Sequence, residues 1–395
     1  MRRALVAALA LAGTLACGLA SGQALVVDTR TPPVTPAPAD GVDFTDEQRP
    51  IDATQAEMPW VRGGRPGVAA RINDALYLQT IETLAPRAPG ATYTTAPPPH
   101  PSLGYLFCEL HFSVDRNDGR VLSIKMAVEY RGAAHCTGED RVFHFDAATG
   151  RQLDVEDLVT PAGQATLIRQ SREAAAANYS RLLATLPPDP DDQDTDADSD
   201  STAAPAPPPP PPSEPGDPSD EEQRRFFKSC RDHWEGPGPE DRELEFELPA
   251  KGGLAVPSSQ CAGNRHEMLM DMPPEPLVVP DARLEPLLTP YGRRLLLGKG
   301  TAPAPAGLFG QTLHGHVGAA AVTLHLGAAH ENFRDDAVYA YDRIGTAITL
   351  YRQKSGETLE FREDADGSGF TLRQVGAALV GTWHGKGKTL PVRLE

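Results

Sequence analysis

The clearest pattern of apolar and polar positions covers residues 122–130, where every second side chain is apolar and the side chains between them are small or charged. This alternation has the period of a strand with one buried face and one wet face. The same alternation runs from 106 to 114, and the Asn-Asp-Gly segment at 117–119 is typical of a hairpin loop. Phe143 and Phe145 indicate another strand. The pattern therefore predicts an antiparallel sheet that needs cover on one side only.

Two helices are expected beside this sheet. Apolar side chains recur every three or four residues over 68–85, just before Pro86. A second run of this kind covers 161–186, and Thr160 followed by Pro161 fits a helix N-cap and a first helical position. We expect both helices to pack on the sheet.

Shorter patterns predict further elements between these. Leu153 and Val155 begin a third strand of the meander, residues 244–248 form a strand, and residues 281–297 contain a short helix. The Ala-Pro-rich segment 302–307 is a linker, and we place the domain boundary there.

The end of the chain has an all-β pattern of its own. Short alternating runs recur at spacings near ten residues, with Gly-, Asp- and Ser-containing turn signals between them. The runs are 322–326, 338–341, 348–350, 359–361, 370–372 and 390–394. About seven short strands indicate a barrel-like meander, with Trp383 as a plug of its core. The predicted fold class is α+β: an antiparallel sheet with two main helices on it, followed by an all-β, barrel-like domain.

Charge is concentrated in one low-complexity insert. The formal net charge is −17, but residues 189–222 hold twelve acidic residues and no Lys or Arg, so the rest of the chain carries only about −5. The insert, taken as 187–222, also contains six consecutive prolines and is expected to be disordered. Neither part has the basic face that a nucleic-acid partner requires.

The N-terminus has the order of a secretory signal peptide. Arg2 and Arg3 precede a short apolar run, and small residues follow it. Cys17 partly resembles a lipobox cysteine, so lipid anchoring through Cys17 is the alternative to simple cleavage. We expect an exported protein, periplasmic or extracellular, without a transmembrane segment in the mature chain. The expected domains are a signal peptide over 1–24, a flexible tether over 25–57, an α+β domain over 58–298, a linker over 299–307 and a β domain over 308–395.

The mature chain has four cysteines, an even number that in an exported protein indicates two disulfides. Sequence alone permits three pairings of Cys108, Cys136, Cys230 and Cys261. A three-residue hairpin loop at 117–119 would place residue 110 opposite residue 126 and Cys108 opposite residue 128, near the loop that holds Cys136. This geometry favours Cys108 with Cys136 and leaves Cys230 for Cys261.

No catalytic or metal-binding motif is evident. Nucleophile-elbow, paired-histidine zinc and phosphate-loop patterns are missing, and we expect no cofactor. An acidic run at 196–200 lacks the Gly and Glu of a calcium loop. A surface metal site could be assembled from four histidines, but polar residues on a wet sheet explain them better. These are His314, His316, His325 and His330.

An ordered series of motifs resembles an extracytoplasmic domain of unknown function. This domain occurs in RsiV-type anti-sigma factors, which act as lysozyme receptors, and beside the catalytic domain of PdaC-type peptidoglycan deacetylases. The series consists of residues 122–124, 130–135, 143–146, 149–150 and 153–158. The last ninety or so residues look like a β unit at the ends of exported bacterial proteins.

The resemblance implies a fold and a tendency to bind at the cell envelope. Gly132 and His135 match the motif, whereas Ala133 replaces its second glycine. The transmembrane helix of the anti-sigma factors and the catalytic domain of the deacetylases are both missing from the matched pattern. We therefore expect a non-catalytic binding module for a lysozyme-like protein or for cell-wall glycan such as peptidoglycan fragments. The alternatives are a cell-wall hydrolase with an unrecognised site and a small-ligand carrier using the C-terminal barrel.

Overall fold

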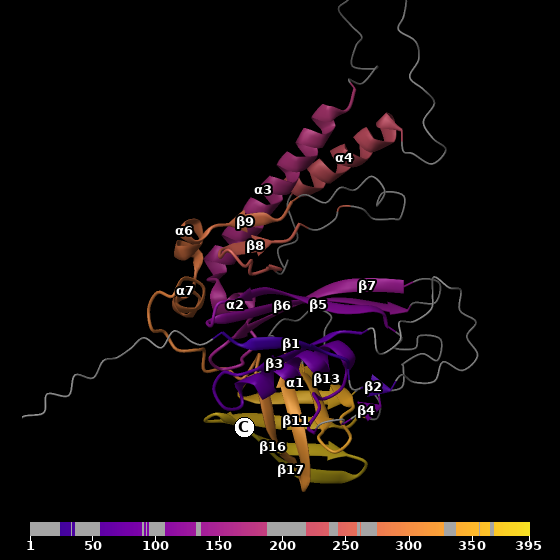
Figure 1. Ribbon diagram of the computed structural model, residues 1–395, viewed down its shortest axis with the longest axis vertical. Coiled ribbons are helices and arrows are strands. Elements are labelled where there is room, and N and C mark those ends of the chain that lie inside the picture. The colour runs from indigo at the N-terminus through magenta and orange to yellow at the C-terminus, as the bar shows by residue number, and fades with distance from the viewer. Residues whose placement is uncertain are drawn as a thin grey trace, which may run out of the picture.

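The computed structural model describes most of the chain as mixed helices and strands with a barrel at the C-terminal end (Figure 1). The described residues are 24–32, 34–35, 56–88, 91, 93–94, 107–131, 136–187, 219–236, 244–258, 261, 275–327, 337–354, 356–363 and 367–395. The α+β class and the C-terminal barrel are confirmed. Within the described residues, no helix has the length and apolar character needed to cross a membrane.

The predicted antiparallel sheet is present, with β6 (Val121–Arg131) between β5 (Phe107–Asn117) and β7 (Cys136–Asp146). Its alternating apolar side chains point into one core together with helix α1 (Val68–Ile81). This core contains Leu122, Ile124, Met126, Val128, Phe143 and Phe145 from the sheet, and Val68, Ile72, Ala75, Leu76 and Tyr77 from the helix. Helix α1 ends at Ile81, four residues before the predicted end, because Glu82 adopts a left-handed conformation.

The register of the first hairpin differs from the prediction by two residues. Leu110 lies opposite Val128 rather than Met126. The turn forms one step later than expected because the Asp118 side chain accepts hydrogen bonds from the backbone N–H groups of Arg120 and Val121, both at 2.9 Å. A bulge near Val114 then restores the expected parity, so Leu110 and Phe112 still face the core, while Val114 is exposed.

The second face of the sheet is exposed at His111, Ser113 and Asp140, as predicted, but it is covered at one end. Ser123 and His144 on that face are buried, and the His144 ring lies 4.5 Å from the ring of Phe246. Residues 244–248 do not form a strand and make only one bridge, Glu247 with Ala255, beside the short pair β8 (Leu254–Val256) and β9 (Leu277–Val279).

The expected third strand of the meander is replaced by a helical turn. Gln152 makes a single bridge to Phe145, after which α2 (Val155–Leu158) begins. Asp154 has the right side chain for a helix N-cap, and this local preference prevails over the two apolar positions that predicted a strand.

The predicted tether contains a strand. Residues of β1 (Val26–Arg30) pair antiparallel with β3 (Met58–Arg62), and Leu25 is buried in the core below them. The five residues are too few to show a period, and their partner lies about thirty residues away in the sequence, so pattern alone could not detect the pair. A minimal parallel pair, β2 (Val34–Thr35) with β4 (Tyr93–Thr94), lies nearby.

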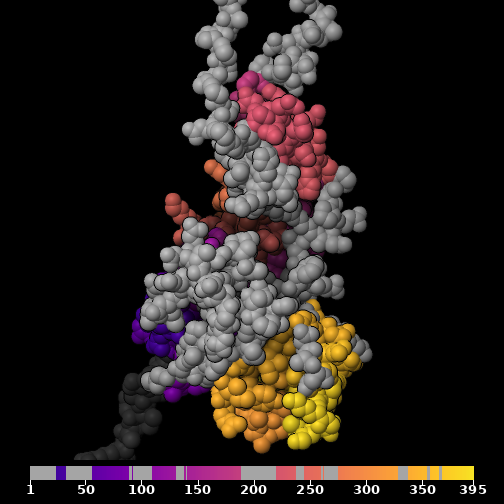
Figure 2. Space-filling model, turned by 90° about the vertical axis from the view of Figure 1, so that its right-hand side faces the viewer, coloured from indigo at the N-terminus to yellow at the C-terminus, as the bar shows by residue number. Residues whose placement is uncertain are grey.

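A two-helix arm extends from the sheet at the end opposite the barrel (Figures 1 and 2). It consists of α3 (Pro161–Thr185), with Thr160 as its N-cap, and α4 (Asp220–Glu235), which pack on each other. Helix α4 begins three residues inside the predicted disordered insert because Ser219 and Glu222 form a capping box. Shorter helices α6 (Asp281–Leu284), η3 (Glu285–Leu287) and α7 (Pro290–Leu297) follow.

The C-terminal unit is a closed barrel of eight antiparallel strands, each paired with the next in sequence. The strands are β10 (Thr312–Val317), β11 (Ala320–Leu326), β12 (Ala337–Tyr341), β13 (Ala347–Lys354), β14 (Thr358–Glu363), β15 (Gly369–Val375), β16 (Ala378–Gly385) and β17 (Lys388–Leu394). Trp383 is buried among the apolar side chains that fill the interior.

The barrel packs on helix α1 and the residues after it, and we call this contact the seam. Leu78 and Leu84 contact Val338 and Ala340 of the outer barrel face. The backbone N–H of Leu84 donates to the carbonyl of Gly345 at 2.7 Å. The barrel and the sheet therefore share one buried boundary.

Candidate ligand-binding site

A turn after β7 anchors the candidate site to the rest of the fold. The completely buried carboxylate of Asp146 accepts hydrogen bonds from the Ala148 N–H, the Tyr291 hydroxyl at 2.7 Å and Arg294 Nη2 at 3.1 Å. Burial, with the neighbouring carboxylate, raises the pKa of the Tyr291 hydroxyl well above its usual value. Tyr291 therefore remains a donor, and the turn is fixed to α7.

Arg151, the residue directly after this turn, connects the turn to the segment that leads into the barrel. Arg151 is only 7% exposed, and its guanidinium pairs with the carboxylate of Asp157, which is 9% exposed, at 3.1 Å. Arg151 Nη1 also donates to the carbonyl of Gly307 at 2.6 Å. Burial raises the pKa of the Asp157 carboxyl, although Arg151 beside it acts in the opposite direction. The pair is a buried, mutually neutralised link between the two units.

A capping box orients the carboxylates that follow. The Asp154 side chain accepts from the N–H of Val155, and the Asp157 side chain accepts from the N–H of Asp154 at 3.1 Å. Both oxygens of Asp157 are thereby engaged, one by Arg151 and one by the backbone. Glu156, in the same helical turn, is exposed and has no partner among the described residues.

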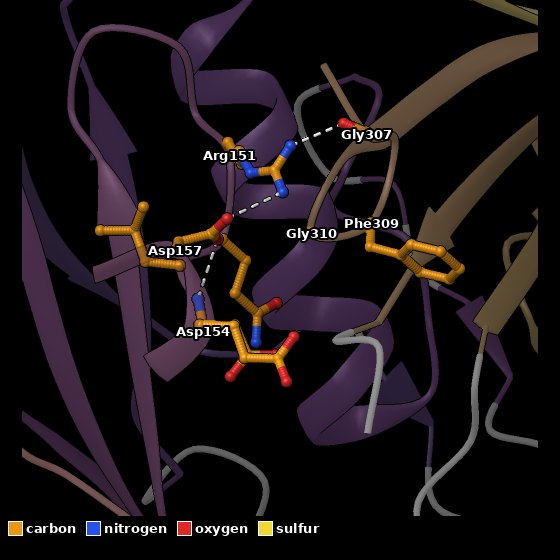
Figure 3. Close-up of a pocket in the computed structure, with 9 residues that line it drawn as sticks. Arg151, Asp154, Asp157, Gly307, Phe309 and Gly310 are labelled. Atoms are coloured by element: carbon orange, nitrogen blue, oxygen red, sulfur yellow. Dashed lines mark hydrogen bonds and ion pairs between the residues drawn. The ribbon is translucent and has the colours of Figure 1, made fainter. Parts of the chain in front are cut away.

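These residues line a cavity of ≈ 120 Å³ between the two units. Figure 3 shows Arg151, Asp154 and Asp157 on one side and Gly307, Phe309 and Gly310 on the other. The N–H of Gln152 donates to the carbonyl of Gly310 at 2.7 Å. A Cβ atom on Gly310 would lie 2.2 Å from the Gln152 carbonyl oxygen, so this close approach requires glycine.

The lining combines an amide, a carboxylate and an aromatic ring. Gln79 donates to the Gln152 side-chain carbonyl at 2.8 Å, which leaves the Gln152 NH₂ group as a donor. Glu156 supplies acceptors. One face of the Phe309 ring is covered by the Arg352 guanidinium, 5.2 Å from the ring centre. A small concave site with a few fixed polar groups and apolar surface is suited to binding a compact, hydroxyl-rich group.

Three carboxylates in one cavity are the cluster that would favour a hydrolase. Asp154 caps a helix, however, and Asp157 is engaged at both oxygens, so Glu156 is the one cavity carboxylate that has no partner in the part of the chain that the structure describes. A paired acid and base for glycoside cleavage needs two available carboxyl groups across the bond. The arrangement fits binding better than catalysis.

The histidines do not form a metal site in the described part of the chain. No group of three metal-ligating side chains occurs among these residues. His314 faces Asp74, while the buried His325 bonds Thr312 Oγ1 at 3.0 Å; His316 is exposed, and His330 lies outside the described residues. Burial lowers the pKa of His325 to about 3, so its ring is neutral.

The residues chosen from the sequence do not coincide with the cavity. Gly132, His135 and Cys17 lie outside the described residues, as do the side chains of Cys108 and Cys136, so those assignments stay predictions. Cys230 and Cys261 are joined in a disulfide, which is the pairing left to them by the hairpin geometry.

Cavity residues 153–157 were missed although they lie inside the motif series. Asp154 followed three residues later by Asp157 is a capping-box pattern, and that signal could have identified the helical turn. No local signal links the turn to Gly307 or Phe309, which are about 150 residues away. Neither a protein-family model nor a curated protein matches this chain.

Proposed function

We propose that this chain is a non-catalytic binding module of the cell envelope and that the cavity between the sheet and the barrel holds one sugar unit of a cell-wall glycan. The observation that supports this most is the mixed lining: the Gln152 side-chain amide, the Glu156 carboxylate and Phe309 line one small space, with Phe309 packed against the barrel core. Such donors and acceptors match vicinal hydroxyl groups, and Phe309 adds apolar surface to the lining. The signal-peptide pattern and the Cys230–Cys261 disulfide are compatible with export.

Calorimetric titration with N-acetylglucosamine oligosaccharides and solubilised peptidoglycan tests this proposal. We expect saturable binding that Glu156→Gln weakens about tenfold, because a hydrogen bond to a charged group contributes roughly 1.5–3 kcal/mol. Glu173→Gln is the matched control, since Glu173 is an exposed carboxylate on the arm. Absence of binding by the unmodified chain, or equal affinity of both variants, would contradict the proposal.

The second candidate ligand is a basic, lysozyme-like protein. The net charge of −17 and the exposed Glu156 favour attraction of such a partner. Titration with C-type lysozyme before and after deletion of residues 188–218 separates two cases. Binding that survives deletion supports a protein-binding module, whereas binding lost with the insert shows charge attraction alone.

A further inference from the structure

A second polar cluster lies within the seam, apart from the cavity. Asp74 of α1 is completely buried, and its carboxylate accepts from Arg87 Nη1 at 2.8 and 2.9 Å. His314 Nε2 of β10 lies 2.9 Å from the same carboxylate. Arg87 Nη2 donates to Thr323 Oγ1 of β11, which donates to Asp342 Oδ1, both at 2.8 Å. We call these five residues the seam cluster.

The seam cluster fixes how the barrel sits on α1. A buried carboxylate is costly unless it is paired and hydrogen-bonded. The barrel supplies His314 directly and holds Arg87 in place through Thr323 and Asp342. Apolar contacts tolerate sliding, whereas these bonds have fixed lengths and directions. The docked orientation is therefore specified by Asp74 more sharply than by the neighbouring leucines.

The same docking sets the two walls of the cavity. Residues 151–157 belong to the sheet side, and residues 307–310 lead directly into β10. Thr312, at the start of β10, donates to the backbone carbonyl of Arg71 on α1 at 3.1 Å, and His314 follows two residues later. A short, continuous segment thus connects the seam cluster to the barrel-side wall.

We propose that Asp74 is a positioning residue for the cavity: through His314 and Arg87 it holds the barrel-side wall at the distance that a ligand needs. A ligand that requires the docked arrangement binds more weakly when that arrangement is less populated. The inference rests on the proposed function for its binding readout, but the closing of the cavity can be measured without a ligand.

The backbone N–H of Gln152 donates to the Gly310 carbonyl across the cavity. Its hydrogen-exchange rate therefore reports directly whether the cavity is closed. We expect Asp74→Asn to accelerate this exchange about tenfold, while the amide of Ala127 in the central strand β6 keeps its protection. His314→Ala, which alters a partly exposed side chain, should also accelerate exchange of the Gln152 backbone N–H. His314→Gln should accelerate it less than His314→Ala does. Asp28→Asn, which breaks the exposed pair with Arg62, is the control.

Titration of the same variants with N-acetylglucosamine oligosaccharides completes the test. We expect affinity to fall about tenfold for Asp74→Asn and to stay unchanged for Asp28→Asn. Unchanged protection of Gln152 in both Asp74→Asn and His314→Ala would overturn the positioning role, whatever the ligand. Accelerated exchange without any binding by the unmodified chain would instead reject the proposed function and keep the positioning role.

Discussion

The barrel and the unit before it are connected in opposite ways. Each barrel strand pairs with its neighbour in sequence, and only the closing pair of β10 with β17 spans the whole unit. The preceding unit is divided into several small sheets, and contacts such as Tyr291 with Asp146 cross 145 residues. In the barrel, each strand pairing is local and is supported by the pairings on either side. The unit before it relies on a few polar contacts between segments far apart in the sequence, and these do not support one another. The unit before the barrel should therefore depend far more on single side chains.

Two carboxylates allow the units to be compared directly. Asp146 accepts from Tyr291 and Arg294, and Glu363 inside the barrel accepts from Tyr339 and Trp383, both at 2.8 Å. Asp146 is completely buried and faces a cation, while Glu363 is half-buried and faces neutral donors. Burial and the Glu363 carboxylate together raise the pKa of Tyr339 well above its usual value.

Asp146→Ala should have the largest effect. It leaves Arg294 without its buried partner and opens the turn that precedes the cavity, so we expect a loss of about 3–5 kcal/mol in the free energy of unfolding. Denaturant unfolding monitored by circular dichroism measures this loss. Glu363→Gln keeps an acceptor for both barrel donors and should cost only about 1 kcal/mol. Equal losses would mean that the two units do not differ as described.

Removal of the arm disulfide should come next. The double substitution Cys230→Ser and Cys261→Ser opens a link across 31 residues and should cost about 2–4 kcal/mol. The loss should be confined to the first unit, so exchange protection of barrel amides such as those of β15 should not change. Reduced protection in β15 would contradict the separation of the two units.

We expect a fall in pH to destabilise both units, because each contains a buried histidine that is neutral in the folded chain. Burial lowers the pKa of His144 to about 4 and that of His325 to about 3, against 6.5 for a free side chain. The unfolded chain therefore takes up protons that the folded chain excludes. Each histidine should lower stability by about 1.4 kcal/mol per pH unit from about pH 6.5 down to its folded pKa, and by nothing above that range.

The variants His144→Gln and His325→Gln isolate these contributions. The difference in unfolding free energy between each variant and the unmodified chain should change with pH by the stated slope and level off below pH 4 for the first variant. A difference that does not vary between pH 6.5 and 4.5 would show that the ring is not excluded from protonation.

The smallest effect is expected on the arm surface. Glu173→Gln removes an exposed i,i+4 pair with Arg169 and should change stability by less than about 0.5 kcal/mol. Thermal unfolding of the two chains side by side checks this value. A larger loss would indicate that the outer face of α3 has a partner.

The difference between the units also determines what the sequence predicts. Barrel strands were found from alternation and turn residues because each hairpin is local, but β10 and β16 lie outside the predicted runs. Helix α3 was found from its period and its Thr-Pro start. Strand β1 and the cover over His144 depend on distant segments, so no local pattern contains them.

The cavity shows the same limit. The sheet side of the cavity lies next to and within the motif series found in the sequence. Its barrel side comes from residues 307–310, and the two sides meet only because the units dock through the seam. A pattern along the chain can identify one wall of such a site, while the second wall depends on how two folded units dock.

The arm has a practical consequence. Helix α3 has 25 residues and is therefore about 37 Å long, and Arg224 in the first part of α4 donates to the Pro187 carbonyl near its far end. The end of α3 and the start of α4 therefore lie on the side of the molecule away from the barrel (Figure 1). A fluorophore or an affinity label attached at these helix ends would therefore lie far from the barrel.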